Sequence, residues 1–158
     1  MISCKPLSTT KYKMETRLIN IKHIPDRQLI KSVLGATIYR CYELFCNTVI
    51  SLSPKTETWS GKSRRGMFYH GFSEFFKTDF KYINMWIDDN TLKCEVHLSK
   101  RKFDCIVQNQ NVFCDEMKMY INGSISTYLD FYIEDKTISD AIKIISSNKY
   151  VDNNHLNC

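Results

Sequence analysis

The chain's 158 residues suffice for one domain, and its hydrophobic content of 43% and charged content of 25% are those of an ordinary globular protein. No window approaches the ~20 apolar residues of a membrane span. The N-terminus lacks the apolar core of a secretory signal, so we expect a cytoplasmic protein that does not contact membranes. The net charge of +5 is uneven, since residues 1–65 hold 12 Lys and Arg against 4 Asp and Glu, whereas residues 66–158 hold 10 against 13. This asymmetry predicts a basic face for nucleic acid or an acidic protein, unless it marks only a solvated helical surface.

The first third of the chain predicts an arm and two helices. Residues 1–17 are polar, basic and without periodicity, which predicts a flexible arm, and the short apolar run at 18–24 predicts an edge strand. Pro25 stands where a helix can begin, and Gly35 separates this helix from a longer one that runs from Ala36 to about Leu52. The apolar stripe of the longer helix consists of Ile38, Cys41, Tyr42, Phe45, Val49 and Leu52.

After Pro54 the hydrophobic period changes to two, which predicts strands. The expected strands are 55–60, 66–72, 80–87 and 91–98, with a loop over 73–79 and a turn over 88–90. In the strand over 91–98 the inward positions are Leu92, Cys94, Val96 and Leu98. Glu95 and His97 therefore share the outer face of that hairpin.

The end of the chain predicts one more strand and a last helix. Residues 103–113 predict a strand or a short irregular segment. Residues 125–133 alternate strictly: Ile125, Thr127, Leu129, Phe131 and Ile133 face one way, and Ser126, Tyr128, Asp130 and Tyr132 face the other. Thr137 and Asp140 resemble a capping pair that begins the last helix, and 151–158 is expected to fray. The sequence thus predicts a single two-layer α+β domain over 18–150, with helices on one face of a largely antiparallel sheet.

Enzymatic chemistry is not predicted. The chain has only five glycines and no glycine-rich phosphate loop. No Cys-x-x-Cys pair supports a zinc site, so no metal or other cofactor is expected. Nucleophilic catalysis needs a thiol or hydroxyl together with a base and a group that orients the base. The sequence does not place three such residues together, so no catalytic residue is assigned. In the absence of a signal peptide, the seven cysteines are expected to be buried thiols rather than a disulfide framework.

Two cationic clusters make binding the favoured function. Six cations make up these clusters: Lys62, Arg64 and Arg65 in a predicted loop, and Lys100, Arg101 and Lys102 at a strand end. Cations at sheet ends track a phosphate backbone, which predicts a non-enzymatic module that binds nucleic acid or a nucleic-acid-bound protein complex. The alternative is a protein–protein interaction module with exposed aromatics, unrelated to nucleic acid, for which a homodimer is one form. A cysteine- or metal-dependent enzyme is the weakest hypothesis.

Aromatic side chains are concentrated between Trp59 and Trp86, which hold nine of the chain's twenty. The candidates for stacking on bases or for an interface are Trp59, Tyr69, Phe72 and Phe76. The same residues are, on average, core residues first and stacking platforms second. The sequence leaves both alternatives open.

From Ile38 to Tyr150 the chain resembles a small uncharacterised bacterial domain that occurs alone or appended to predicted nucleases and restriction-type proteins. The resemblance lies in YELFCNTVISLSPKTE, in DFKYINMWIDDNTLKCEVHL and in YLDFYIEDKTISDAIKIISSNKY. The chain departs from that family in NQNVFCDEMKMYINGS, where Gly123 is the only glycine and no histidine occurs. The resemblance implies a compact accessory module or inhibitor in a phage or mobile-element defence setting, and it supplies no catalytic residues.

Overall fold

The computed structural model describes residues 26–59, 72–79 and 82–149. In chain order the elements are α2 (Gln28–Leu34), α3 (Ala36–Leu52), β1 (Glu57–Trp59), β2 (Ser73–Lys77), β3 (Tyr82–Asp88), β4 (Thr91–His97), α4 (Lys100–Gln108), the 3-10 helix η2 (Gln110–Val112), α5 (Asp115–Asn122), β5 (Tyr128–Tyr132) and α6 (Ile138–Lys149). The strands form one antiparallel sheet in the order β1-β2-β3-β4-β5. The predicted single α+β domain is confirmed. No helix within these ranges has the length and apolar character needed to cross a membrane.

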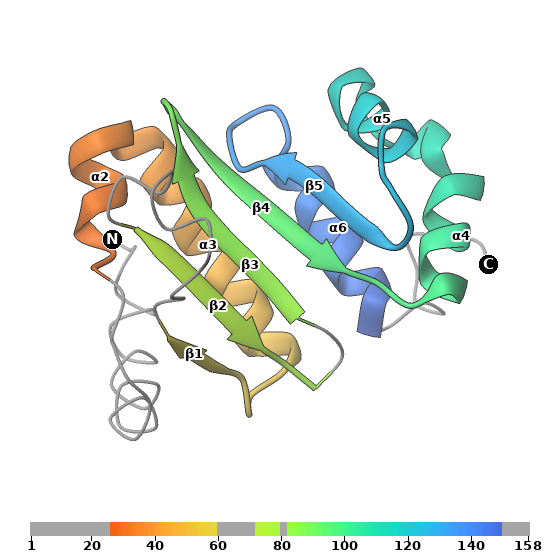
Figure 1. Cartoon of the computed structure of the whole chain (residues 1–158), viewed down its shortest axis with the longest axis horizontal. Coiled ribbons are helices and arrows are strands. Elements are labelled where there is room, and N and C mark those ends of the chain that lie inside the picture. The colour runs from red at the N-terminus through yellow and green to blue at the C-terminus, as the bar shows by residue number, and fades with distance from the viewer. Residues whose placement is uncertain (1–25, 60–71, 80–81, 150–158) are drawn as a thin grey trace.

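The helices that the structure describes cover one face of the sheet (Figure 1). In that view α3 and α6 run behind the strands, while α4 and α5 lie beyond β5 at the other side from β1. The other face of the sheet, toward the viewer, carries none of the described helices. The outward side chains of the strands lie on that face.

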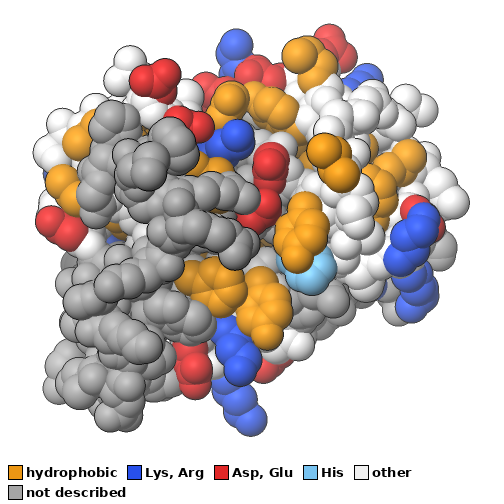
Figure 2. Space-filling view, viewed as in Figure 1, with side chains coloured by type: hydrophobic (Ala, Val, Ile, Leu, Met, Phe, Trp, Pro, Cys, Tyr) orange, Lys and Arg blue, Asp and Glu red, His pale blue; other side chains and the backbone are white. Residues whose placement is uncertain are grey.

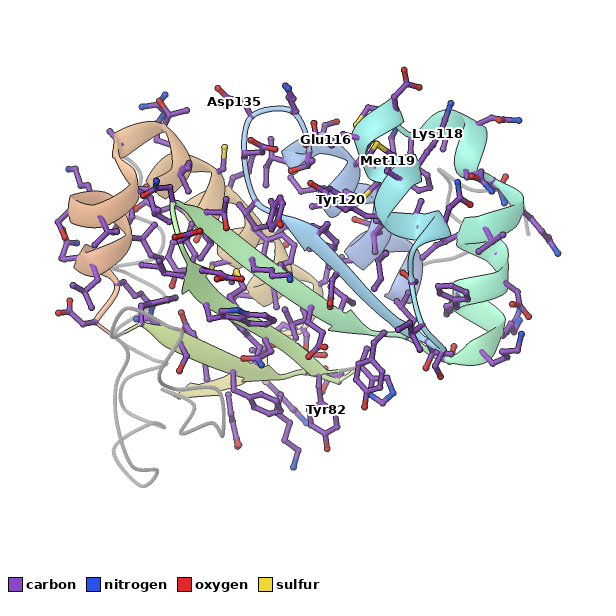
Figure 3. The ribbon with its side chains drawn as sticks, turned by 45° about the horizontal axis from the view of Figure 1, so that its top comes forward. Tyr82, Glu116, Lys118, Met119, Tyr120 and Asp135 are labelled. Carbon is purple, nitrogen blue, oxygen red and sulfur yellow. The ribbon has the colours of Figure 1, made fainter. Side chains whose placement is uncertain are left out.

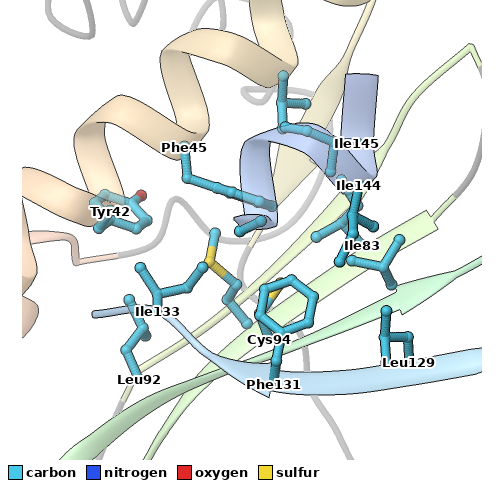
Figure 4. Packing of buried hydrophobic residues seen from close by; sticks show 14 of the residues in the cluster. Tyr42, Phe45, Ile83, Leu92, Cys94, Leu129, Phe131, Ile133, Ile144 and Ile145 are labelled. Atoms are coloured by element: carbon cyan, nitrogen blue, oxygen red, sulfur yellow. The ribbon is translucent and has the colours of Figure 1, made fainter. Parts of the chain in front are cut away.

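The core lies between α3, α6 and the inner face of the sheet. Figure 4 shows Phe45 of α3 and Ile144 of α6 meeting Phe131 of β5, and the three side chains are fully buried or nearly so. The inward residues of β4 are Leu92, Cys94 and Val96, each with 0% exposure, as the alternation predicts. Gly35 separates α2 from α3 with φ of 99°, a conformation that favours glycine over other residues.

Several sequence-based expectations were wrong. The segment 73–79, expected as a loop, contains β2, and the segment 103–113, expected as a strand or irregular, contains most of α4 and η2. Helix α5 was not expected at all. Ile125, placed on the inner face by alternation, is 82% exposed, because the regular strand begins only at Tyr128. The edge strand expected at 18–24 and residues 66–71 of another expected strand lie outside the described residues.

The capping pair and the cysteines also differ from expectation. Asp140 lies in the first turn of α6, but its carboxylate accepts a hydrogen bond of 2.8 Å from the backbone N–H of Cys114, at the start of α5. The side chain therefore ties two helices together as well as occupying a helix N-terminus. Cys41, Cys46, Cys94 and Cys114 are free thiols, whereas Cys105 is disulfide-bonded, so the expectation of unpaired cysteines fails at that position.

A buried carboxylate joins the first two strands to the first two helices. Glu74 points inward from β2 with 0% exposure and receives hydrogen bonds from Arg27 Nη2 at 2.7 Å and from the hydroxyl of Tyr42 at 2.5 Å. Thr58 of β1 donates to the same carboxylate, and Arg27 Nε donates to the hydroxyl of Tyr42 at 2.9 Å. Burial alone would lower the pKa of Arg27, but the charge of Glu74 holds it well above the usual value. The guanidinium therefore stays charged.

Substitution Glu74→Gln is expected to lower the free energy of unfolding by about 3–5 kcal/mol, because it leaves the buried guanidinium without its counter-charge. Urea denaturation followed by circular dichroism measures the change. The matched control is Glu57→Gln on β1, whose side chain is only half-buried, and which we expect to cost about 0.5 kcal/mol or less. Equal effects of the two substitutions would contradict a stabilising role for this ion pair.

Candidate functional site

The face of the sheet that none of the described helices covers holds a patch made of three cross-strand rows, which we call the open-face patch. Its members are Tyr82, His97 and Tyr128 in the first row, Phe75, Asn84, Glu95 and Asp130 in the second, and Trp86, Lys93 and Tyr132 in the third. Figure 2 shows hydrophobic side chains gathered around the histidine of this face, with acidic side chains beside them. The patch therefore combines ring faces with fixed negative charge.

The first row is a series of stacked rings. His97 and Tyr128 stack with ring centroids 4.3 Å apart and planes 10° apart. Tyr82 lies 6.4 Å from His97 on its other side and is nearly parallel to it. Phe75 of the second row contacts Tyr82 with ring centroids 5.4 Å apart and planes tilted by 30°. Tyr82 and Tyr128 are each 45% exposed, and Figure 3 shows Tyr82 extending away from the ribbon. Large rings with this much exposure are able to stack on a flat ligand.

The second row brings two carboxylates together. Glu95 of β4 lies directly opposite Asp130 of β5 in the register, and like charges in that position destabilise a sheet. Asn84 of β3 lies opposite Glu95 on its other side. Among the described residues, Asp130 Oδ1 is buried and makes no hydrogen bond. A buried acceptor without a donor calls for a physical explanation.

The third row contains a cation between rings. Lys93 Nζ lies 5.9 Å from the ring centroid of Trp86 and 5.9 Å from that of Tyr132. Trp86 is only 3% exposed, so this end of the patch is more enclosed than the end at Tyr128. Lys93 also offsets part of the negative charge of the second row, because it is two residues from Glu95 on the same strand face.

Three cations lie at the start of α4, the helix that follows β4. Lys100, Arg101 and Lys102 form the first turn of α4, and Ser99 caps that turn by accepting from the backbone N–H of Lys102 at 3.2 Å. Positive side chains at a helix N-terminus oppose the helix dipole, so the cap and an exposed Lys100–Asp104 ion pair of 2.9 Å must stabilise the turn. Lys100 follows His97 by three residues along the chain.

The structure places only part of the predicted site. Lys62, Arg64, Arg65 and Tyr69 lie outside the described residues, and so does the side chain of Trp59, whose backbone belongs to β1. Phe72 and Phe76, predicted as possible stacking residues, are 1% and 0% exposed. That prediction was wrong, because both rings pack in the core. The described residues hold slightly more Asp and Glu than Lys and Arg, so the excess positive charge of the chain belongs to the other segments.

A second polar cluster lies between α5 and the β5–α6 connection. The hydroxyl of Tyr120 donates to Glu116 at 3.3 Å, Lys136 Nζ lies 3.7 Å from Glu116, and the rings of Tyr120 and Tyr132 meet edge to face at 5.4 Å. Figure 3 shows Tyr120 directed from α5 toward the sheet, with Glu116 toward the loop that holds Asp135. Burial and the adjacent charge of Glu116 raise the pKa of Glu134. These contacts attach α5 to its neighbours.

Neither metal nor thiol chemistry is supported within the described residues. No group of three or more His, Cys, Asp or Glu side chains there is arranged to hold a metal ion. Burial raises the pKa of Cys41 to about 11 and the pKa of Cys46 and Cys94 well above the usual value. Cys114 is exposed, and its pKa is raised as well, first by partial burial and then by Asp140. Thiols of this kind are weak nucleophiles near neutral pH.

Comparisons with known protein families, with curated proteins and with solved structures find no match for this chain. The resemblance to the small bacterial domain therefore stays a prediction, and the chemistry of the open-face patch carries the functional argument.

Substitution Glu134→Gln is expected to stabilise the protein at pH 7. A raised pKa in the folded state means that ionisation of Glu134 costs stability, so its contribution is complete below the reference pKa of 4.5 and is lost as pH rises through the folded value. Thermal unfolding should show the variant to be more stable at pH 7 by up to about 1 kcal/mol, since solvent screens a partly exposed charge. The difference should vanish in acid, and a difference that persists there would contradict this assignment.

Brief treatment of the native protein with iodoacetamide at pH 7.5 should modify Cys114 alone among the four free thiols that the structure describes, and slowly, because its pKa is raised. Cys41, Cys46 and Cys94 should react only after denaturation. Peptide mass spectrometry reads out each position. Rapid labelling of any one of them in the native state would support the hypothesis of a thiol-dependent enzyme.

Proposed function

We propose that the protein is a non-enzymatic binding module for single-stranded nucleic acid, which it contacts through the open-face patch. The observation that carries the proposal is the exposed ring stack of Tyr82, His97 and Tyr128 on the face of the sheet that no described helix covers. The cations at the start of α4 follow His97 closely along the chain. The module would act on nucleic acid alone or within a nucleic-acid-bound protein complex. The resemblance noted above adds the expectation of an accessory or inhibitor in a defence setting.

An antiparallel sheet suits this ligand for geometric reasons. Its outward side chains form a broad surface on which splayed bases can lie, and aromatic rings on such a surface stack with any base because every base has a π-face. Tyr128, 45% exposed, ends the stack on the β5 side, whereas Tyr82, also 45% exposed, is contacted by Phe75 on the side away from His97. Their stiff backbone support on β3 and β5 limits the entropy lost on binding.

The phosphates would lie toward α4 rather than over the centre of the sheet. Arg101 is exposed in the first turn of α4, and Lys100 is exposed beside it. The N-terminal amide groups of the same helix add partial positive charge in the same place. Over the second row of the patch the carboxylates of Glu95 and Asp130 repel phosphate, so the bases and not the backbone would occupy that region.

A protein ligand is the second candidate, because carboxylates between aromatic rings also suit a basic peptide. Apolar side chains outside the patch add to this alternative: Met119 is 70% exposed and Ile125 82% exposed. A homodimer through these residues would appear as a concentration-dependent mass in light scattering. Binding of an arginine-rich peptide in place of nucleic acid would favour this candidate over the first.

The wild-type protein should bind a fluorescently labelled single-stranded oligonucleotide of mixed sequence, with affinity that falls as salt rises from about 50 to about 200 mM. Substitution Tyr128→Leu should weaken binding about tenfold, because stacking contributes ~1–3 kcal/mol per base. Fluorescence anisotropy measures both effects. Met119→Ala, which removes an exposed side chain from α5, is the control and should bind as the wild type does.

Substitution of Arg101 by Gln provides a second arm of the same experiment. Loss of a phosphate contact should weaken binding equally for strands of every base composition. It should also reduce the slope of the logarithm of the binding constant against the logarithm of salt concentration by about one unit. Absence of binding by the wild type at low salt would overturn the proposed function, as would equal binding by the wild type and Tyr128→Leu.

A further inference from the structure

Helix α5 ends in the dipeptide Asn122-Gly123, which occurs nowhere else in the chain. Both residues are exposed, and within the described part of the chain the side-chain amide of Asn122 has no hydrogen-bond partner. Asparagine is thermolabile, because the backbone nitrogen of the next residue can attack the carbonyl carbon of its side chain. Glycine hinders this attack least, since it has no side chain and its backbone turns freely.

We infer that Asn122 is a site of spontaneous deamidation, which the native end of α5 slows and the opening of its last turn permits. The products at this position are aspartate and isoaspartate. Both carry a negative charge that asparagine lacks, and isoaspartate also changes the path of the main chain.

The reaction needs only water. The backbone nitrogen of Gly123 forms a bond with Cγ of Asn122, and the bond between Cγ and Nδ2 breaks. The proton lost by the glycine nitrogen leaves with the amide group as ammonia, and the product is a cyclic succinimide. One water molecule then opens the ring. Attack at the side-chain carbonyl gives aspartate, whereas attack at the backbone carbonyl gives isoaspartate, whose main chain contains an additional methylene group.

The cap of α5 holds the attacking nitrogen away from its target. The N–H of Gly123 donates to the carbonyl oxygen of Met119 at 3.0 Å, and the N–H of Ser124 donates to that of Ile121 at 3.3 Å. Ring closure requires the nitrogen of Gly123 to leave its acceptor and approach Cγ of Asn122, so the last turn must open first. Helix ends open at a much lower free-energy cost than the whole domain unfolds. Deamidation in the native protein is therefore slowed but not prevented.

Close packing at the helix end explains why glycine follows Asn122. A Cβ atom at position 123 would lie 3.2 Å from the carbonyl oxygen of Met119, which is tighter than most Cβ contacts in proteins. A larger residue would therefore crowd the carbonyl group at the end of α5. The same close approach that favours glycine gives Asn122 its most reactive neighbour.

Isoaspartate at this position would disturb the end of α5. The added methylene group lengthens the chain between Ile121 and Ser124, so the hydrogen bond between them loses its alignment. The new carboxylate also lies at the C-terminus of the helix, where the helix dipole disfavours negative charge. We therefore expect the modified protein to be less stable than the native one.

Purified protein is incubated at physiological temperature and mildly alkaline pH for several weeks. Peptide mass spectrometry, with synthetic reference peptides that contain aspartate or isoaspartate, then measures conversion at each asparagine. Asn90 and Asn111 are internal controls, because both are exposed but precede the β-branched residues Thr91 and Val112. Conversion at Asn122 should be about tenfold faster or more than at either control, since a β-branched neighbour is bulky and stiff. It should also be about tenfold slower in the native than in the denatured protein, a factor that corresponds to about 1.4 kcal/mol for opening the turn.

Asn122→Gln is the matched control variant, because glutamine keeps the amide group but must close a larger and less favourable ring. It should remain unmodified, and its thermal unfolding should not change with age, whereas the aged wild type should unfold at a lower temperature than fresh protein. Absence of conversion at Asn122 in the native protein would overturn the inference, and so would equal conversion at Asn90 and Asn111. Equal rates in the native and denatured protein would overturn the control by the last turn of α5. An equal loss of stability in the aged Asn122→Gln protein would show that Asn122 is not the cause.

Discussion

The ion pair between Glu74 and Arg27 determines how the two layers of this protein meet. Glu74 places a charged group on the inner face of β2, where hydrophobic side chains would normally pack, and its carboxylate is satisfied only if Arg27, Tyr42 and Thr58 all approach it. These three partners come from the turn before α2, from α3 and from β1. These contacts hold α2 and α3 against the inner face of the sheet. Within the described ranges the opposite face has no helical layer, and it carries the outward side chains of the proposed binding surface.

Hydrophobic periodicity predicted most of the elements because most of them bury one regular stripe. Helix α3 and strands β3, β4 and β5 follow their patterns closely. The expectation failed at β2, where the inward position is Glu74, a residue that any pattern counts as polar. It failed again at α4, because three cations in a first turn are unfavourable for a helix and Ser99 compensates only through a cap that contacts Lys102.

The candidate surface was harder to predict than the fold. The alternation of polar and apolar residues correctly assigned His97 and Tyr128 to outer positions of their strands. Phe72 and Phe76 were chosen as stacking candidates on aromatic content alone, and both are buried in the core. A sequence pattern shows which way a side chain points along one strand. It does not show which strands become neighbours, and the stack of Tyr82, His97 and Tyr128 and the opposition of Glu95 and Asp130 arise only from strand order and register.

Strand order in the sheet equals strand order along the chain, with the longest excursion between β4 and β5, where α4 and α5 intervene. Most partners in the sheet are therefore near neighbours in sequence, and such topologies have low contact order and fold rapidly. The last strand is the exception, because α4 and α5 separate it from β4 along the chain. Until β5 pairs with it, β4 is an edge strand whose backbone N–H and C=O groups on that side have no partner strand. A chain at that stage of folding is therefore the most prone to pair with another chain and aggregate.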